Sequence, residues 1–271
     1  MSDKEKNTQT SPDSPKVMIH VEDLWKQYGT LQVLKGLSID IFEGETLVIL
    51  GRSGVGKSVL LKQIIGIESP DRGFVDVEGI RVSSISLRKR LALNLRMGML
   101  FQGAALFDSM TVGENTSFYL KQHEPHLDQK EVKQRVEEAL RMVGLEGTEQ
   151  KMPSDLSGGM RKRAALARLI IYRPKIILYD EPTTGLDPIT AMQINDLINK
   201  TQEELHSTSV VVTHDIRSAM KVGTRLAFHH DGTIACVASR DEFFHLKNPL
   251  IQSFYDNAAV SISNHKQDFL A

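Results

Sequence analysis

Cysteine is almost absent from this sequence of 271 residues, because Cys236 is the single example. One thiol cannot form a disulfide within the chain, which fits a reducing compartment. An excess of charge is also absent, since 33 Lys and Arg residues balance 34 Asp and Glu residues to a formal charge of −1. A general nucleic-acid binder would carry a basic excess. Apolar runs of about 18 residues or more are missing as well, so we expect no membrane-spanning helix.

Local composition adds detail at two places. Residues 1–16 are polar, lack the apolar core of a signal peptide and are predicted to be a disordered lead-in. The densest basic cluster is Arg88-Lys89-Arg90, with Arg96 nearby. We interpret this cluster as the solvated face of a helix, because the balanced charge of the chain disfavours a nucleic-acid patch. No nucleic acid is therefore expected among the partners.

Short apolar runs predict a sheet that is buried on both faces, as parallel sheets are. The runs occupy residues 46–50, 97–101, 176–180 and 209–213. A helical pattern follows the first run from Lys57 to Gly66, and another, with Ile194, Leu197 and Ile198, separates the last two. Residues 103–160 are expected to be largely helical, with Asp128 as an N-cap. The predicted fold class is therefore α/β with an inserted helical subdomain.

Weaker strand patterns lie at both ends of this core. Residues 17–21, 32–34 and 37–41 read as three short strands before the core. After it, Asp231-Gly232 between two apolar runs predicts a hairpin.

Residues 51–58 read Gly-Arg-Ser-Gly-Val-Gly-Lys-Ser, the pattern of a phosphate-binding loop. The glycines let the backbone approach a polyphosphate, and the following helix presents its positive N-terminal end. Lys57 is predicted to reach the β and γ phosphates, and the Ser58 hydroxyl to ligate Mg²⁺. The predicted nucleotide-binding residues are Gly51, Arg52, Ser53, Gly54, Val55, Gly56, Lys57, Ser58 and Val59. Tyr28 is a candidate for stacking on adenine, with a half-buried strand aromatic as the alternative.

Polar residues follow three of the apolar runs. Asp180 is predicted to hold Mg²⁺, and Glu181 to act as general base or to orient water for attack on the γ phosphate. His214 is predicted to donate to the γ phosphate and to link it to Glu181, and Gln102 to reach the metal or the attacking water. The plainer alternatives are an acidic helix N-terminus for Asp180-Glu181 and a polar strand end for His214.

Leu156-Ser157-Gly158-Gly159-Met160 precedes a basic helical run, Arg161-Lys162-Arg163 with Arg168. Two glycines before a helix predict a second anion site, with the Ser157 hydroxyl as a donor. An ordinary helix N-cap is the alternative. Two phosphate sites but one nucleotide per loop predict a dimer, in which Ser157 of one chain covers the γ phosphate on the other.

Taken together, these motifs resemble the ATP-binding-cassette ATPases over residues 17–245. In that resemblance Tyr28 is the adenine-stacking aromatic, residues 51–58 are the Walker A loop and Gln102 is the Q-loop glutamine. Residues 156–160 are the signature, and Asp180 and Glu181 are the Walker B carboxylate and catalytic glutamate. Asp187 belongs to the D-loop, and His214 is the switch histidine. The resemblance implies a P-loop NTPase core with a mostly parallel sheet, an N-terminal antiparallel β subdomain, a helical subdomain at about 103–160 and a C-terminal extension at 246–271. It also implies hydrolysis of ATP with Mg²⁺ by a homodimer.

Residues 103–115 are similar to the segment after the Q-loop in the Mla-type phospholipid-transport ATPases. Met160, where Gln is usual, and Val59, where Thr is commoner, agree with that resemblance. It implies an MlaE-like integral-membrane permease, with an MCE-domain lipid-binding protein and often a STAS-domain subunit, and a peripheral position on the cytoplasmic face of the inner membrane. Two alternatives stay open: a transporter of another small solute, and a non-transport cassette protein, which the single set of motifs disfavours.

Overall fold

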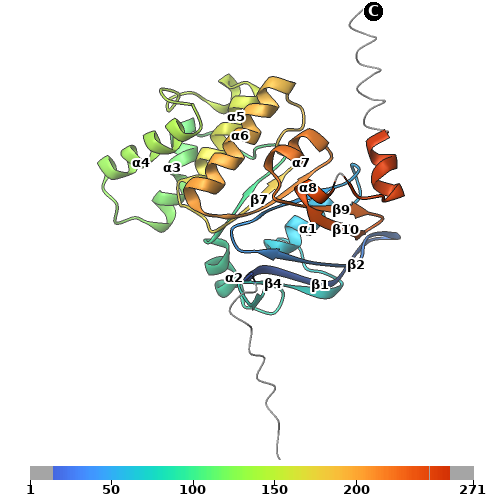
Figure 1. Ribbon diagram of the computed structural model, residues 1–271. Coiled ribbons are helices and arrows are strands. Elements are labelled where there is room, and N and C mark those ends of the chain that lie inside the picture. The colour runs from blue at the N-terminus through green and yellow to red at the C-terminus, as the bar shows by residue number, and fades with distance from the viewer. Residues whose placement is uncertain (1–14, 244, 257–271) are drawn as a thin grey trace, which may run out of the picture.

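The computed structural model describes residues 15–243 and 245–256. Two sheets lie one against the other, and a group of helices extends from one side of the larger sheet (Figure 1). Residues 1–14 of the predicted lead-in and residues 257–271 of the predicted C-terminal extension lie outside the described residues, whereas 246–256 are described. Within the described part of the chain, no helix has both the length and the apolar composition needed to cross a membrane.

The smaller sheet is antiparallel and is built from the N-terminal third of the chain. Its strands, in the order β2-β1-β4-β5, are β1 (Val17–Tyr28), β2 (Leu31–Phe42), β4 (Arg72–Val77) and β5 (Ile80–Arg81). The expectation of separate strands at 32–34 and 37–41 is wrong, because β2 spans both. Gly36 interrupts the apolar pattern there, but the register skips it as a β-bulge with φ 78° and the strand continues. The predicted antiparallel β subdomain is confirmed.

The larger sheet has the order β10-β9-β3-β8-β7-β6. Its strands are β3 (Thr46–Leu50), β6 (Met97–Leu100), β7 (Ile176–Asp180), β8 (Thr208–Thr213), β9 (Arg225–His230) and β10 (Thr233–Ser239). All neighbours pair in parallel except β9 and β10, which form an antiparallel hairpin around Asp231-Gly232. The mostly parallel sheet and the hairpin are both confirmed.

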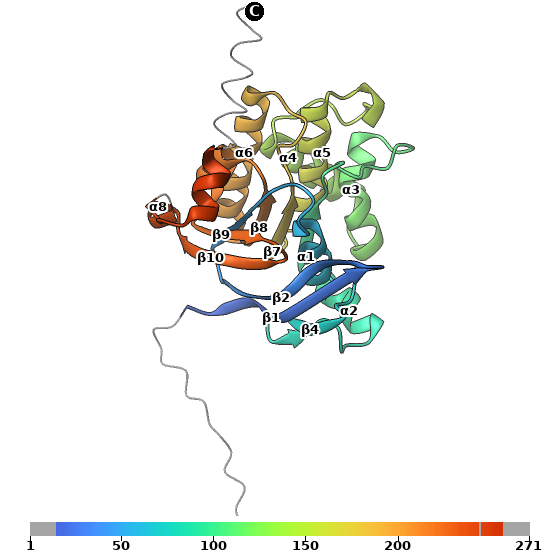
Figure 2. The same ribbon diagram turned by 90° about the vertical axis from the view of Figure 1, so that its right-hand side faces the viewer.

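Helices connect the strands and cover the faces of the larger sheet (Figures 1 and 2). They are α1 (Lys57–Ile64), α2 (Leu87–Asn94), α3 (Val112–His123), α4 (Gln129–Met142), the 3₁₀ turn η1 (Pro153–Asp155), α5 (Gly158–Ile170), α6 (Pro188–Leu205), α7 (Ile216–Val222) and α8 (Arg240–Phe243), with a further helix at 249–256. The expected helical block at 103–160 is only partly helical, since residues 103–111 form a loop. Asp128 caps α4 as predicted, by accepting a hydrogen bond from the amide of Glu131.

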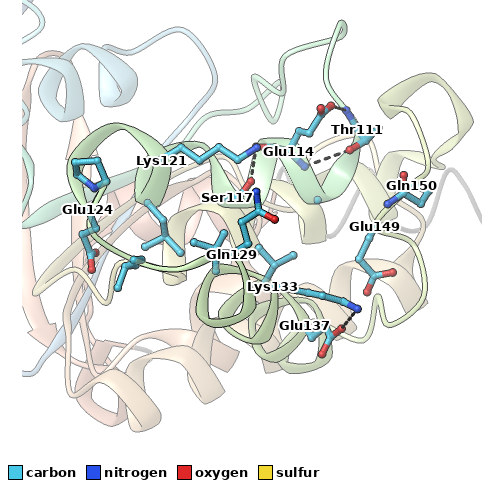
Figure 3. A pocket seen from close by; sticks show the side chains of 16 residues that line it. Thr111, Glu114, Ser117, Lys121, Glu124, Gln129, Lys133, Glu137, Glu149 and Gln150 are labelled. Atoms are coloured by element: carbon cyan, nitrogen blue, oxygen red, sulfur yellow. Dashed lines mark hydrogen bonds and ion pairs between the residues drawn. The ribbon is translucent and has the colours of Figure 1, made fainter.

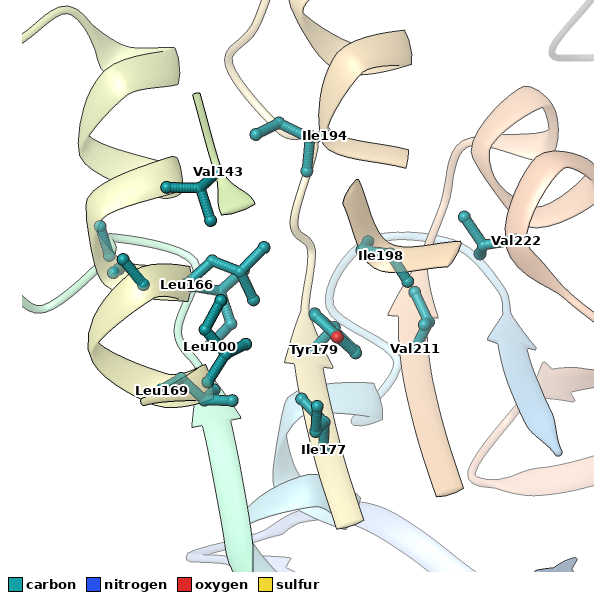
Figure 4. Packing of buried hydrophobic residues seen from close by; sticks show 14 of the residues in the cluster. Leu100, Val143, Leu166, Leu169, Ile177, Tyr179, Ile194, Ile198, Val211 and Val222 are labelled. Atoms are coloured by element: carbon teal, nitrogen blue, oxygen red, sulfur yellow. The ribbon is translucent and has the colours of Figure 1, made fainter. Parts of the chain in front are cut away.

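Each central strand is buried on both faces, which divides the core into two clusters. On β7, Ile177 and Tyr179 face the first cluster, whereas Ile176 and Leu178 face the second. The first cluster packs β7 against Leu166 and Leu169 of α5 and Ile194 and Ile198 of α6 (Figure 4). The second fills the space between this sheet, α1 and the N-terminal sheet. Because both faces are filled, the carboxyl ends of the strands are held in fixed positions.

Candidate nucleotide-binding site

The glycine loop connects the end of β3 to the start of α1. The amide of Gly51 donates to the carbonyl of Thr213 at 3.2 Å, which ties the loop to the end of the neighbouring β8. Gly56, the N-cap of α1, has φ 103°, and a Cβ there would lie 2.6 Å from Cγ1 of Val33. A larger residue would meet both strain and a clash at this point. The loop is thus held at the carboxyl edge of the sheet, before a helix N-terminus.

Lys57 is the first residue of α1 and is buried, although it carries a charge. Its Nζ donates to the carbonyls of Gly51 and Arg52, each at 2.8 Å, and lies 3.2 Å from Oε1 of Glu181. Burial lowers the pKa of Lys57, whereas the Glu181 carboxylate acts to raise it. A polyphosphate at this loop would give the ammonium group a second anionic partner.

Ser58 and Asp180 meet although 122 positions separate them in sequence. The Ser58 hydroxyl donates to Oδ1 of Asp180 at 2.6 Å, where β7 ends next to the glycine loop. Burial raises the pKa of Asp180, so its ionised form lacks sufficient compensation from the protein alone. A hydroxyl and a carboxylate are oxygen donors of the kind that Mg²⁺ prefers. These two side chains therefore fit the predicted metal ligands, and a bound cation would offset the buried charge.

Glu181 is the centre of a set of contacts with three residues from different parts of the chain. His214 Nδ1 lies 2.8 Å from Oε2 of Glu181, the Thr184 hydroxyl donates to the same oxygen at 3.0 Å, and Lys162 Nζ donates to the Glu181 carbonyl at 3.3 Å. The backbone of Glu181 has φ 47°, which turns the side chain away from the direction of β7. Sequence reasoning missed Thr184 and Lys162 as partners of Glu181.

The charges of Glu181 and His214 support each other. Burial alone would raise the pKa of Glu181, but the hydrogen bond with His214 and the charge of Lys57 bring it below its usual value. The same hydrogen bond raises the pKa of His214, against a smaller opposing effect of burial. Glu181 is thus ionised at neutral pH, as a group that accepts a proton from water must be.

A cavity of about 320 Å³ opens above this group of residues. Its lining is Val33, Ser53, Gly54, Gly56, Lys57, Ser58, Val59, Gln102, Glu181, Thr184 and His214. The structure therefore brings Gln102, which follows β6, to the same cavity as the glycine loop, Glu181 and His214. Within residues 15–243 and 245–256, no group of three or more His, Cys, Asp and Glu side chains could hold a metal ion. The predicted Mg²⁺ ligands are of mixed type, a hydroxyl, a carboxylate and an amide.

Several of the predicted nucleotide contacts lie elsewhere. Arg52 and Val55 line a different cavity of about 70 Å³, together with Phe228 and His229 of β9. Tyr28 is at the exposed end of β1, where its hydroxyl donates to Glu68. Its role with adenine stays a prediction, since the phosphate cavity does not include it.

The five residues 156–160 do not line the phosphate cavity of their own chain. Ser157 caps α5 by accepting from the amide of Met160 at 3.3 Å, so the plain N-cap interpretation describes its contacts within one chain. Gly159 packs against Thr190 of α6, where a Cβ would lie 2.4 Å from Cγ2. Asp187 caps α6 by accepting from the amides of Ile189 and Thr190. The signature segment therefore packs against the first turn of α6, which Asp187 caps.

The basic run that follows the signature is not a free anion-binding surface. Arg161, Arg163 and Arg168 donate to the carbonyls of Leu156, Gly144 and Ala105, respectively. Lys162 is buried beneath Glu181. These side chains satisfy backbone carbonyls of loops next to α5, so the expectation of a second anion site rests on Ser157 and the glycines alone.

The fold and the site define a P-loop ATPase. Residues 34–184 match the family model described as ABC transporter. The Arabidopsis thaliana protein TRIGALACTOSYLDIACYLGLYCEROL 3, chloroplastic, is 37% identical over 88% of this chain and 73% of that protein. The probable ribonucleotide transport ATP-binding protein mkl of Mycobacterium leprae is 35% identical over 90% of this chain and 70% of its own length.

Solved structures agree with these relatives. A dimeric post-hydrolysis state of the ATP-binding cassette MJ0796 bound to ADP and Pi superposes with a TM-score of 0.76 and 32% identity, over 82% of this chain and 99% of the other. The chain belongs to the ABC transporter family, as the ATPase of a transport system. Like other members it binds ATP with Mg²⁺ and hydrolyses it.

Proposed function

We propose that this ATPase powers phospholipid transport across a bacterial envelope through an MlaE-like permease, from the cytoplasmic face of the inner membrane. The observation that carries the proposal is the segment 103–115, which resembles Mla-type ATPases and is built as a fixed surface next to Gln102. A second line of support is a relative whose name is that of a galactolipid, TRIGALACTOSYLDIACYLGLYCEROL 3.

A buried asparagine organises this segment. Asn115 on α3 accepts a hydrogen bond from the amide of Phe107 at 2.8 Å and donates to the carbonyls of Phe107, Met110 and Thr111, each at 3.0 Å. Thr111 also begins α3 with a complete capping box, which it shares with Glu114. The loop therefore has a defined shape that a partner can recognise.

The start of the segment is held from the other side. Arg168 of α5 donates to the carbonyls of Ala105 and Ala104 at 2.7 and 3.2 Å, where both alanines have positive φ. Four apolar residues after Gln102 are candidates for a permease contact: Ala104, Leu106, Phe107 and Met110. Ala104 is buried and is not available, whereas Phe107 is 42% exposed and Leu106 and Met110 are half-buried. Phe107 is thus the most accessible of the four to a partner.

A groove of about 840 Å³ between α3 and α4 begins where the segment ends (Figure 3). Leu120, Leu127, Val132 and Val136 give it an apolar floor. Charged residues of both signs form its rim: Glu114, Lys121, Glu124, Lys133, Glu137 and Glu149. An apolar floor with a mixed charged rim suits an amphipathic helix. We assign this groove, together with Phe107, to a cytoplasmic helix of the permease.

We further propose that two copies of the chain enclose two ATP molecules, with Ser157 of one copy facing the γ phosphate on the other. Two facts support this assembly: residues 156–160 lie away from the phosphate cavity of their own chain, and the MJ0796 cassette is dimeric. Within each site, Lys57 and the loop amides would hold the phosphates and Glu181 would take a proton from the attacking water. Bound Mg²⁺ would neutralise phosphate charge beside Ser58 and Asp180, with Gln102 as a further ligand.

The first test is a pull-down of the tagged chain from detergent-solubilised native membranes, with mass spectrometry of proteins and lipids. We expect an MlaE-like permease with bound phospholipid, accompanied by MCE-domain and STAS-domain subunits. A permease for nucleotides or another small solute would keep the ATPase and overturn the cargo. Ribosomal proteins, or no membrane partner, would overturn the transporter assignment for this chain.

The docking surface has its own matched pair of variants. Phe107→Asp is expected to abolish recovery of the permease and to remove stimulation of the ATPase by it, since an aspartate cannot be buried in an apolar contact. Val237→Asp, at a residue that is 41% exposed on β10, is the control. Equal recovery with both variants would remove Phe107 from the interface.

A further inference from the structure

Helix α2 carries an exposed apolar stripe that the nucleotide site does not use. Leu87 and Leu91 of α2 and Leu95 at its C-cap are 69%, 58% and 38% exposed, and they are spaced four residues apart, so they share one face. Ala92 is also exposed. A merely solvated helix face, as the sequence suggested for this region, would present polar side chains in these positions.

The orientation of α2 is fixed by its opposite face. Leu93 is buried in the core cluster next to the N-terminal sheet, and Arg90 donates to the carbonyl of Gly66 at 3.3 Å. Ser86 caps the helix by accepting from the amide of Lys89. Because these contacts hold the inner face against the domain, the leucine stripe must point outward.

The charge around the stripe has one sign. Residues 79–107 contain Arg81, Arg88, Lys89, Arg90 and Arg96 and no Asp or Glu, whereas the whole chain is balanced. Arg81 pairs with Asp76 and Arg96 pairs with Glu78, and these two acidic partners lie outside the stretch 79–107. Among the ion pairs of residues 15–243 and 245–256, none involves Arg88 or Lys89, and both side chains are exposed. The stripe is therefore flanked by two free cationic groups.

From these observations we infer that α2 is an interfacial contact, which inserts Leu87 and Leu91 into the surface of an anionic phospholipid leaflet while Arg88 and Lys89 bind lipid phosphates. An apolar face flanked by Lys and Arg is the pattern of helices that lie in the plane of a membrane surface. In Figure 2, α2 lies along the same right-hand edge of the molecule as α3, below it, and α3 borders the groove assigned above to the permease. One side of the domain would thus meet both permease and lipid.

This inference goes beyond the proposed function, because lipid surface contact does not depend on the cargo. It is tested with the purified full-length chain and two kinds of vesicle, one of equal parts phosphatidylglycerol and phosphatidylcholine, the other of phosphatidylcholine alone. The partition coefficient is measured by flotation at low ionic strength. We expect binding to the anionic vesicles that is reduced by added salt and is much weaker for the neutral vesicles.

Two pairs of substitutions separate charge from apolar contact. Arg88→Gln with Lys89→Gln should lower the partition coefficient roughly 25-fold, since each basic side chain near an anionic surface strengthens binding about fivefold. Leu87→Ser with Leu91→Ser should lower it by roughly tenfold or more, since two leucines lose their apolar contact. The charge-matched control is Lys130→Gln with Arg141→Gln, at two exposed basic residues of α4. This variant should have the same partition coefficient as the unsubstituted chain.

Three results would overturn the inference: no preference for anionic vesicles, equal binding by the α2 variants and the control, or loss of the permease from detergent pull-downs of the α2 variants with vesicle binding unchanged. The last result would assign the stripe to a protein partner. The pull-down that tests the proposed function can fail while vesicle binding persists, so the two failures are distinguishable.

Discussion

The phosphate cavity and the groove between α3 and α4 use charged residues in opposite ways. In the cavity, Lys57, Asp180 and Glu181 are buried and meet specific partners at 2.6 to 3.3 Å. In the groove, the charged residues form a rim around an apolar floor, and several are exposed. A buried charge without its partner is costly, whereas a rim charge contributes little.

This difference explains why the cavity, but not the groove, can be recognised from short sequence motifs. Buried, mutually dependent charges restrict the residue type at each position, so the cavity is encoded by short patterns. A groove depends on shape and on the pattern of apolar residues, which many sequences can provide. If this comparison holds, the cavity should tolerate few substitutions of its charged residues. The loop at 103–111, beside the groove, should depend on the hydrogen bonds that hold its shape.

The largest expected effect follows from Glu181→Gln. Nucleotide binding should persist, but hydrolysis should slow by about 10²-fold or more, because glutamine cannot accept the proton of the attacking water. Steady-state turnover and equilibrium nucleotide binding check the two parts separately. Full turnover in this variant would show that Glu181 is not the base. It would also show that the cavity restricts residue type less strictly than the comparison with the groove implies.

The second effect is on stability, at the edge of the groove. Asn115→Ala should lower the free energy of unfolding by about 2 to 3 kcal/mol, because buried backbone groups of residues 107–111 lose their partner. Asn199→Ala is the control, since that side chain makes one hydrogen bond, to the Lys221 carbonyl, and should cost less than about 1 kcal/mol. Urea denaturation measures both. Equal costs would show that the loop is not dependent on Asn115.

A third prediction compares two adjacent glycines at the start of α5. Gly159→Ala should cost about 1 to 3 kcal/mol, because the new methyl group would clash with Thr190. Gly158→Ala should be tolerated, since its Cβ would meet Leu186 at an ordinary contact distance of 3.6 Å. Adding Thr190→Ser removes the clashing methyl and should restore the stability of the Gly159 variant. If stability is not restored, the destabilisation by Gly159→Ala does not come from the clash with Thr190.

The smallest effect concerns pH. Glu181 raises the pKa of His214, so the protonated histidine contributes stability at low pH that is lost as pH rises through its folded-state pKa. His214→Gln should therefore be more destabilising at pH 6 than at pH 9. The difference should stay under about 1 kcal/mol, because His214 is partly exposed and solvent screens the pair. Denaturation curves at the two pH values test this, and the opposite sign would contradict the assigned pairing.

Sequence reasoning predicted the parts of the fold that depend on local patterns. The strands that precede the glycine loop, Glu181 and His214 are short apolar runs, so their burial and their parallel pairing could be expected. The bulge at Gly36 could not, since nothing local distinguishes a skipped residue from a break between strands. Nor could the loop at 103–111, because its shape depends on Asn115 and Arg168, which lie farther along the chain.

The candidate site shows the same division. The motifs indicated Lys57, Ser58, Gln102, Asp180, Glu181 and His214, and the structure places all six at or beside one cavity. The contacts of Lys162 and Thr184 with Glu181 were not predicted, because a lysine in a basic run and a threonine in a turn carry no signal of burial. Arg52 and Val55 match the loop pattern but face the opposite side of the loop, toward β9.

Helix α5 has a mechanical consequence. It begins at the signature glycines and, about 15 Å along its axis, Arg168 holds the loop that leads to the proposed permease contact. A helix of this length packed into the core is a stiff rod. A shift of the signature toward a nucleotide on a second copy would therefore tilt the far end of the rod and carry the Phe107 loop with it. In this arrangement α5 would act as a lever, and the hydrogen bonds of Arg168 would pass its movement to the loop at the proposed permease contact.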